Sequence, residues 1–307
     1  MDAFIPLAFV SGAVVGAMVV WVVRRRGTEN VARSPRRRYG WTVAAITAVA
    51  TVAVTLATGY AVVRWKFRAR PVTKVSVSDA VKQFRETDKT TPSGDVLPGK
   101  VVGGPAPGVY SYKGSGFYEL KVPVVGADKR VLLAQIPATL VHIGACWELT
   151  IQFFKQHSWS AQYCKDAAGT IVMRFWRGAN QYFGRDVSWS YACDPADMVR
   201  PKASAGNSWK QTCRPRGKPA EKSPPKHAQV TFIRRESVDI AGIKTPAIHV
   251  RRTIKTSGDQ TGATERHLWF SETNGLLLRL SEKSTSTGMA TFRSDWDVVL
   301  SSTTPTR

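Results

Sequence analysis

Residues 290–302 read ATFRSDWDVVLSS, and this stretch decides the class of fold. Apolar and polar side chains alternate along it, as they do in a strand that buries one face and exposes the other. One face carries Phe292, Ser294, Trp296, Val298 and Leu300, and the other carries Arg293, Asp295, Asp297 and Ser301. The segment therefore predicts a half-buried β-strand near the end of the chain.

Segments of the same kind fill the chain from Val109 onward, with turn residues between them; examples are CWELTIQFF (146–154) and TPAIHVRRTIKT (245–256). Two such runs are joined by TNG (273–275), and Asn-Gly suits a type I′ hairpin turn. We expect roughly ten to twelve strands in a mainly-β domain over residues 109–307. A long antiparallel meander of this size either curls into a barrel or forms a curved sheet, a half-barrel, around a ligand or a helix.

A short helix and a linker precede this domain, over residues 71–108. Ser78 is a candidate N-cap, and Ala80, Val81 and Phe84 fall on one face, which predicts an amphipathic helix at about 79–87. The Gly- and Pro-rich residues that follow predict a linker. Residues 214–227, RPRGKPAEKSPPKH, are basic and Pro-rich and predict an exposed excursion that does not pair in a sheet. This excursion is either a solvated insertion or a basic contact arm.

Two uncharged apolar runs, 4–23 and 41–63, open the chain, and each is long enough to cross a hydrocarbon core as a helix. Neither ends in a clear cleavage site, so residues 1–70 predict a hairpin of two retained transmembrane helices. For the first run the alternative is a start codon placed too far upstream, with translation beginning later, at Met18 for example.

The loop between the runs, 24–40, contains seven Arg and one Glu, and the segment after the second run contains four basic residues. Short loops rich in Lys and Arg stay on the cytoplasmic side. The topology therefore rests on a basic cluster made of Arg24, Arg25, Arg26, Arg36, Arg37 and Arg38. This places the loop in the cytoplasm and both termini, with residues 71–307, outside the cell membrane.

The net charge of +22 narrows the class of partner. Residues 71–307 contain 33 Lys or Arg against 20 Asp or Glu, and such a basic domain favours an anionic partner. An extracytoplasmic position argues against nucleic acid. It leaves a lipid surface, an anionic wall polymer or an envelope protein.

The four cysteines agree with an exported domain, because all of them lie after residue 71 and an even number in an oxidising compartment predicts disulfides. Four cysteines allow three pairings. We favour Cys146–Cys164 and Cys193–Cys213, because each pair encloses a local segment. A zinc site is disfavoured because the short Cys-x2–4-Cys spacing is missing from the sequence.

We find no motif that carries catalysis: the sequence contains no Gly-x-Ser-x-Gly, no phosphate-binding glycine loop and no His-Glu-x-x-His. The five histidines are scattered at long spacings. We therefore expect no enzyme activity, no cofactor and no metal.

Arg252 and Trp296 are the candidate ligand-binding residues. Arg252 alternates with Val250 and Ile254 and so falls on an apolar strand face, where an unpaired cation is expensive. Either a bulge resets the register there, or Arg252 points into a cavity that receives an anion or a carboxylate, such as a lipid or glycolipid head group. Trp296 is one of seven Trp residues in the exported part, some of which are candidates to line an apolar pocket.

The anchor is followed by the segment VSVSDAVKQFRE (75–86), the Cys-containing blocks and the ending LWFSETNGLLLRLSEKS (268–284). With these parts in this order, the chain resembles a group of membrane-anchored exported proteins of high-GC actinobacteria that has no assigned function. A helix ahead of a long antiparallel sheet is also similar in architecture to the lipoprotein-carrier-like half-barrels of bacterial envelopes. That second resemblance implies an acyl chain in the concave face of the sheet. It implies no site residues, and the membrane anchor favours a tethered role over a shuttling one.

Two functions from different classes follow. The first is a membrane-tethered extracytoplasmic module that binds a lipid or lipoprotein in a curved β-sheet. The second is a structural or interaction protein of the cell envelope that contacts a partner protein or an anionic wall polymer.

Overall fold

The computed structural model describes residues 37–66, 71–90, 103–123, 125–217, 224–258 and 260–307. The chain separates into two compact units, Met1–Arg68 and Ala69–Arg307, and the second is called the β domain below. The boundary lies two residues before the one that the sequence predicts.

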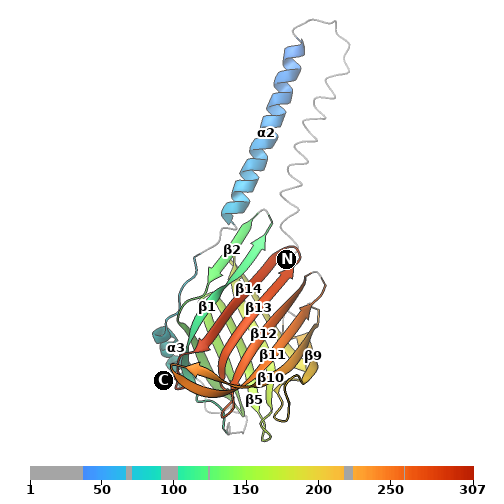
Figure 1. Ribbon diagram of the computed structural model, residues 1–307. Coiled ribbons are helices and arrows are strands. Elements are labelled where there is room, and N and C mark those ends of the chain that lie inside the picture. Colours follow the sequence, from blue (N-terminus) through green and yellow to red (C-terminus); the bar gives the residue numbers. More distant parts are fainter. Residues whose placement is uncertain (1–36, 67–70, 91–102, 124, 218–223, 259) are drawn as a thin grey trace. The chain divides into compact units, whose positions relative to one another are not determined.

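In the first unit, helix α2 (Arg37–Lys66) contains the whole of the predicted span 41–63 (Figure 1). Within the described residues, Ile46–Trp65 is the one helical stretch long and apolar enough to cross a membrane, judged by length and composition. The hydroxyls of Thr51 and Thr55 donate to carbonyl oxygens four residues earlier, so these polar groups are satisfied inside the helix.

The span 4–23 and the residues Arg24, Arg25, Arg26 and Arg36 lie outside the described residues, and Arg37 and Arg38 begin α2. The cytoplasmic position of the loop 24–40 stays a prediction.

The β domain is built from antiparallel strands (Figure 1). They are β1 (Gly108–Val122), β2 (Gly126–Val131), β3 (Ile136–Ile143), β4 (Cys146–Phe154), β5 (His157–Lys165), β6 (Ile171–Tyr182), β7 (Arg185–Asp194), β8 (Asp197–Val199), β9 (Ser208–Pro215), β10 (Lys226–Ile240), β11 (Ile243–Thr256), β12 (Thr261–Ser271), β13 (Leu277–Thr287) and β14 (Thr291–Leu300). Among the described residues, twelve of these strands form one closed ring, while β2 and β8 pair at its margin.

The ring closes because β1 is long enough to pair on both edges. Its first part pairs with β3, and its length from Tyr112 to Lys121 pairs with β14. The open sheet and the half-barrel, which the sequence left as alternatives, are therefore wrong: the meander closes into an antiparallel barrel. Gly116 lies at the seam with a φ of +102°, and a Cβ there would lie 2.1 Å from the carbonyl oxygen of Asp295. Only glycine allows this close approach of the two strands.

The short helix is α3 (Val77–Thr90), which packs on the outer wall of the barrel. Ala80 and Val81 bury against Val109, whose neighbours Tyr110 and Tyr112 point into the barrel. The predicted apolar face is thus confirmed, but the helix does not fill the concave side. The backbone N–H of Asp79 donates to the hydroxyl of Ser76, so the helix is capped two residues earlier than predicted.

Two local predictions were also wrong. The connection between β12 and β13 is a five-residue loop, 272–276, in which Gly275 has a positive φ and Asn274 does not, so it is not a type I′ turn. The backbone N–H of Gly275 donates to the carbonyl of Ser271 inside this loop. The excursion 214–227 is shorter than predicted: β9 continues through Pro215 and β10 begins at Lys226, because both ends extend the ladder around Cys213.

Both predicted disulfides are confirmed. Each joins residues directly opposite each other on neighbouring antiparallel strands, Cys146 with Cys164 and Cys193 with Cys213. They differ in their surroundings. Cys193 and Cys213 are buried in the core, whereas Cys146 and Cys164 alternate with the inward Trp147 and Tyr163 and so lie on the outer face.

Candidate functional site

Arg252 and Trp296 lie in one cross-strand row inside the barrel. Arg252 is directly opposite Arg266, Arg266 is opposite Glu282, and Glu282 is opposite Trp296, on the successive strands β11 to β14. All four side chains are at most 7% exposed. The row one step away along the same strands is Val250, Leu268, Leu280 and Val298. The interior therefore changes from aliphatic to charged between two neighbouring rows, and the charged row is called the ionic row below.

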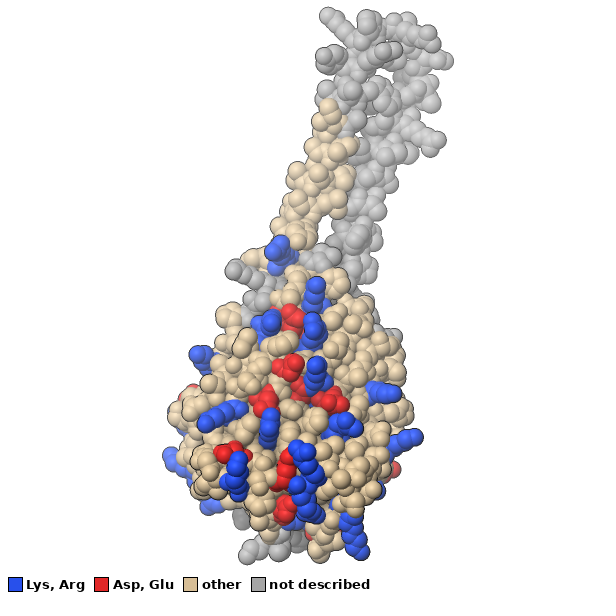
Figure 2. Space-filling view, in the orientation of Figure 1, with Lys and Arg blue, Asp and Glu red and all other residues tan. Residues whose placement is uncertain are grey.

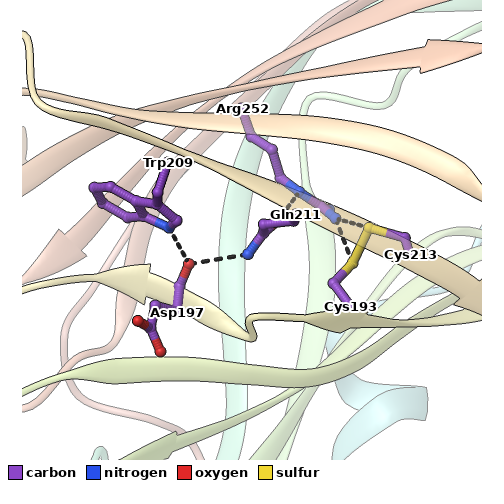
Figure 3. The surroundings of a disulfide bond; sticks show 6 residues. All are labelled: Cys193, Asp197, Trp209, Gln211, Cys213 and Arg252. Atoms are coloured by element: carbon purple, nitrogen blue, oxygen red, sulfur yellow. Dashed lines mark hydrogen bonds between the residues drawn. A yellow bond between two sulfur atoms is a disulfide. The ribbon is translucent and has the colours of Figure 1, made fainter.

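Arg252 points inward, and the pairing of β11 with both neighbouring strands is regular at this residue. The bulge that the sequence left as one alternative is therefore not found at Arg252, whereas the cavity that receives an anion stays a prediction. Its Nε donates to Oε1 of Gln211 at 3.2 Å, and its NH2 group lies 2.9 and 3.1 Å from the sulfurs of Cys193 and Cys213 (Figure 3). Gln211 is fixed in turn, because its Nε2 donates to the backbone carbonyl of Asp197.

Within the described part of the chain, no carboxylate forms an ion pair with Arg252. Burial lowers the pKa of Arg252 to about 9, and repulsion by Arg266 adds to this shift. The side chain thus has hydrogen bonds that orient it, but no described carboxylate balances its charge. This is the condition under which a buried cation costs most free energy.

Arg266 forms an ion pair with Glu282, the carboxylate of the ionic row. Its Nε and NH2 atoms both lie 2.6 Å from Oε2 of Glu282, and Oε1 of Glu282 accepts a hydrogen bond from the hydroxyl of Ser294. Trp176 lies beside both arginines, with its ring centroid 4.9 Å from the guanidinium carbon of Arg266 and 5.2 Å from that of Arg252. An indole face stabilises cations, but it does not neutralise them.

Lys226 adds a third cation at the start of β10. Its Nζ lies 4.6 Å from the ring centroid of Tyr191 and 5.8 Å from that of Trp176. Burial lowers the pKa of Lys226 to about 8, and Arg266 lowers it further, while Glu282 opposes the shift. Three cations therefore share the neighbourhood of one carboxylate.

Several polar atoms in the barrel interior have no hydrogen-bond partner among the described residues. They belong to inward side chains and are buried: Nε1 of Trp159, Trp176 and Trp296, the hydroxyls of Tyr163 and Tyr182, and Oδ1 of Asn180. An unpaired buried polar atom costs about 1–3 kcal/mol. Such atoms are expected where an interior receives a polar ligand or water rather than serving as a core alone.

Trp296 belongs to an aromatic cluster at the far end of the ionic row. Its ring centroid lies 5.1 Å from Phe153 and 5.8 Å from Tyr118, and Tyr118 lies 4.1 Å from the ring of His157. Burial, followed by repulsion from Arg130, lowers the pKa of His157 to about 3, so this imidazole is neutral. The two predicted residues, Arg252 and Trp296, thus line the same interior, but Arg266 and Glu282 separate them.

Sequence analysis did not single out Arg266 or Glu282. It considered Trp176 only as one of the seven Trp residues, and Lys226 only as part of the basic excursion 214–227. A signal for two of them is present in the sequence, because Arg266 alternates with Thr264 and Leu268, and Glu282 alternates with Leu280 and Ser284. Applied to β12 and β13, the alternation argument that identified Arg252 would have found them. No local pattern marks Lys226, which lies at a strand end.

The outer wall carries a groove of about 420 Å³ over β4 to β7. Hydroxyl side chains and two arginines line it, namely Thr150, Ser158, Ser160, Ser188, Ser190, Arg177 and Arg216. The guanidinium carbons of Arg177 and Arg216 lie 5.8 and 5.6 Å from the ring centroid of Phe175. Arg177 also pairs with Glu148, which leaves Arg216 as the cation free of a carboxylate among the described lining residues.

The face formed by β1 and β10–β14 has a different character. Figure 2 shows basic and acidic side chains intermingled along it. Two of the ion pairs on these strands are Arg234–Glu236 and Arg279–Asp297. Charges of both signs therefore offset each other on this face, and no single-sign patch forms there within the described residues.

Comparisons with known proteins add little. No protein-family model matches the chain, and no curated protein matches it. Among solved structures, it is similar to the crystal structure of the hypothetical lipoprotein YmcC from Escherichia coli (K12), at 11% sequence identity and a TM-score of 0.32, covering 73% of this chain and 97% of that chain. A TM-score of this size supports no conclusion about fold or function, and the sequence resemblance to actinobacterial proteins stays a prediction.

Proposed function

We propose that the chain is a membrane-tethered extracytoplasmic binding module that receives a lipid or lipoprotein in its β domain. The observation that carries this proposal is a group of polar atoms inside the closed barrel that find no hydrogen-bond partner in the described part of the chain, on Trp159, Trp176, Trp296, Tyr163 and Tyr182. A barrel interior that served only as a core would pair these atoms or replace them with apolar groups.

The ligand is expected at the ionic row of the barrel. In the neighbouring row the interior is filled by Val250, Leu268, Leu280 and Val298, each at most 2% exposed. An acyl chain has no room among these close-packed side chains unless they move. The polar part of the ligand would therefore contact the ionic row, and any acyl chain would extend away from the aliphatic rows.

The extracytoplasmic position rests on the basic loop 24–40 and on the two disulfides, which form and persist in oxidising compartments. Fusion of alkaline phosphatase, which is active only outside the cytoplasm, tests it. We expect activity for a fusion after Arg307 and none for a fusion within 27–35. The opposite pattern would place the β domain in the cytoplasm.

The proposal is for binding without catalysis and without a cofactor, because the sequence contains none of the motifs that carry hydrolysis, phosphoryl transfer or metal binding.

Native mass spectrometry tests ligand binding. The full chain is expressed with a protease site inserted at 67–70, purified from membranes, and cleaved so that residues 71–307 are released after folding. We expect an added mass that chloroform–methanol extraction removes. A bare mass with both disulfides intact would refute lipid or lipoprotein binding.

The outer groove favours a second candidate function, an interaction protein of the cell envelope. Its hydroxyl groups and the cation of Arg216 suit an anionic polyhydroxyl polymer of the wall or an acidic partner surface. Crosslinking in cells through a photoreactive residue at Ser188 would recover a partner under this hypothesis. Placed at Thr253, a half-buried site on β11, the same residue should recover none.

A further inference from the structure

We propose that Arg252, Arg266 and Lys226 form a binding site for one phosphate group at the ionic row. The inference deepens the proposed function, since it names the chemical class of ligand at the same place in the barrel. It does not require that the anion belong to a lipid.

Charge is the first argument. Glu282 is engaged by two nitrogens of Arg266 and by Ser294, so it has little capacity left for Arg252 or Lys226. Two positive charges therefore remain without an anionic partner among the described residues, and Arg252 is only 1% exposed. A bound oxyanion would offset this charge, and guanidinium groups are well matched to its geometry.

The second argument is independent of charge and concerns donors. Nε1 of Trp176 and the hydroxyl of Tyr163 are buried and have no described partner. Trp176 contacts both arginines. Burial raises the pKa of Tyr163, and the charges of Arg252 and Arg266 oppose this rise without cancelling it, so the hydroxyl stays protonated. An oxyanion accepts hydrogen bonds from neutral N–H and O–H donors such as these.

The site is rigid on the side of Arg252. Gln211 and the disulfide Cys193–Cys213 hold this guanidinium in place (Figure 3). Gln211 itself is held by the carbonyl of Asp197, which also accepts a hydrogen bond from Nε1 of Trp209 at 2.8 Å. Such secondary contacts reduce the loss of side-chain entropy on binding, as expected for a prearranged site.

The source of the anion is either a lipid head group or a free ion, and both present the same chemistry to the arginines. The full chain in nanodiscs of phosphatidylcholine is titrated with inorganic phosphate in one arm. In the other arm, without phosphate, the nanodiscs contain increasing phosphatidylglycerol. Tryptophan fluorescence and the midpoint of thermal unfolding of the β domain are measured in both.

We expect a saturable response in at least one arm, because a ligand that binds only the folded state raises the midpoint. A response to phosphate alone identifies a free oxyanion, and a response to phosphatidylglycerol alone identifies a head group. No response in either arm would overturn the inference.

Charge-matched variants distinguish binding at this site from a general effect of surface charge. Arg252→Gln should weaken the response about tenfold or more, while Arg251→Gln, which removes the same charge from the neighbouring outward position, should leave it unchanged. Equal losses in the two variants would overturn the inference. If Arg252→Gln does not fold, Lys226→Met, at a half-buried strand end, takes its place with Lys255→Met, an exposed β11 residue, as its control.

The outcome for this site is distinguishable from that for the proposed function. A phosphate response without any extractable lipid would retain the anion site and reject lipid binding. An extractable lipid without a response to phosphate or to phosphatidylglycerol would retain lipid binding and reject the anion site.

Discussion

Arg266 and Glu282 face each other across β12 and β13 and form a buried ion pair, with 2.6 Å between Oε2 of Glu282 and NH2 of Arg266. Glu282 is the carboxylate of the ionic row. The contribution of the pair to stability depends on the cations around it. The charge of Glu282 favours the charged form of Lys226, and Arg266 also repels Arg252, so a change that removes the carboxylate leaves these cations uncompensated.

Glu282→Gln should therefore lower the free energy of unfolding by about 3–5 kcal/mol, the usual effect of leaving one buried charge unpaired. Chemical denaturation at neutral pH measures it. The matched control is Glu265→Gln, which alters an exposed pair with His267 on the same sheet and should cost less than about 1 kcal/mol. Equal costs for the two variants would mean that the ionic row is not the buried network described here.

The alternation of side chains was sufficient to predict the β class and the strand positions, because period-2 patterns depend only on neighbours in sequence. It left the direction of Arg252 open between a bulge and an inward side chain, and the register of β11 decides for the latter. The closure of the barrel could not be predicted in the same way. It depends on the pairing of β1 with β14, whose partners are 170 to 188 residues apart in the chain, and a local pattern of side chains does not report on pairing over that distance. Likewise, the pairing of Arg266 with Glu282 follows from a register that the loop 272–276 sets, and the sequence had favoured a tighter turn there.

The seam between β1 and β14 can be tested through glycine. Gly116→Ala introduces a Cβ 2.1 Å from a backbone oxygen of β14, whereas Gly126→Ala, also at a positive φ, meets nothing within 4 Å. Both changes strain the backbone, but only the first forces the strands apart. We expect Gly116→Ala to cost about 1–3 kcal/mol more than Gly126→Ala in urea unfolding. Similar costs would indicate that the seam opens freely, as in a half-barrel.

The two disulfides should stabilise the fold equally but differ in their effect on the ionic row. They close segments with sequence separations of 18 and 20, so each is expected to contribute about 3 kcal/mol. Replacing Cys193 and Cys213 by Ala also removes the sulfurs beside Arg252, whereas replacing Cys146 and Cys164 does not.

Phosphate titration of the two double variants separates these effects. The two variants are compared at a temperature at which both are fully folded. We expect a weaker response to phosphate only for the variant without Cys193 and Cys213. An unchanged response in that variant would show that the disulfide does not position Arg252.

Acid should destabilise the β domain through its buried histidines. The pKa of His157 is lowered to about 3 by burial and then by Arg130, and that of His249 is lowered to about 4 by burial and then by His267. Their unfolded pKa is about 6.5. Between pH 6.5 and these folded values the unfolded state binds more protons than the folded state, so stability falls as pH falls.

His157→Phe tests the larger of these contributions. It removes one titrating group from the aromatic cluster of Tyr118 and Phe153, and should flatten the dependence of unfolding free energy on pH by about 1.4 kcal/mol per pH unit between pH 6 and 4. His227→Gln, at an exposed position on β10, serves as the control and should leave the slope unchanged. Unfolding curves in urea at half-unit steps of pH supply the slopes. If His157→Phe leaves the acid slope as steep as in the original chain, His157 is charged in the folded state and the aromatic cluster is open to water.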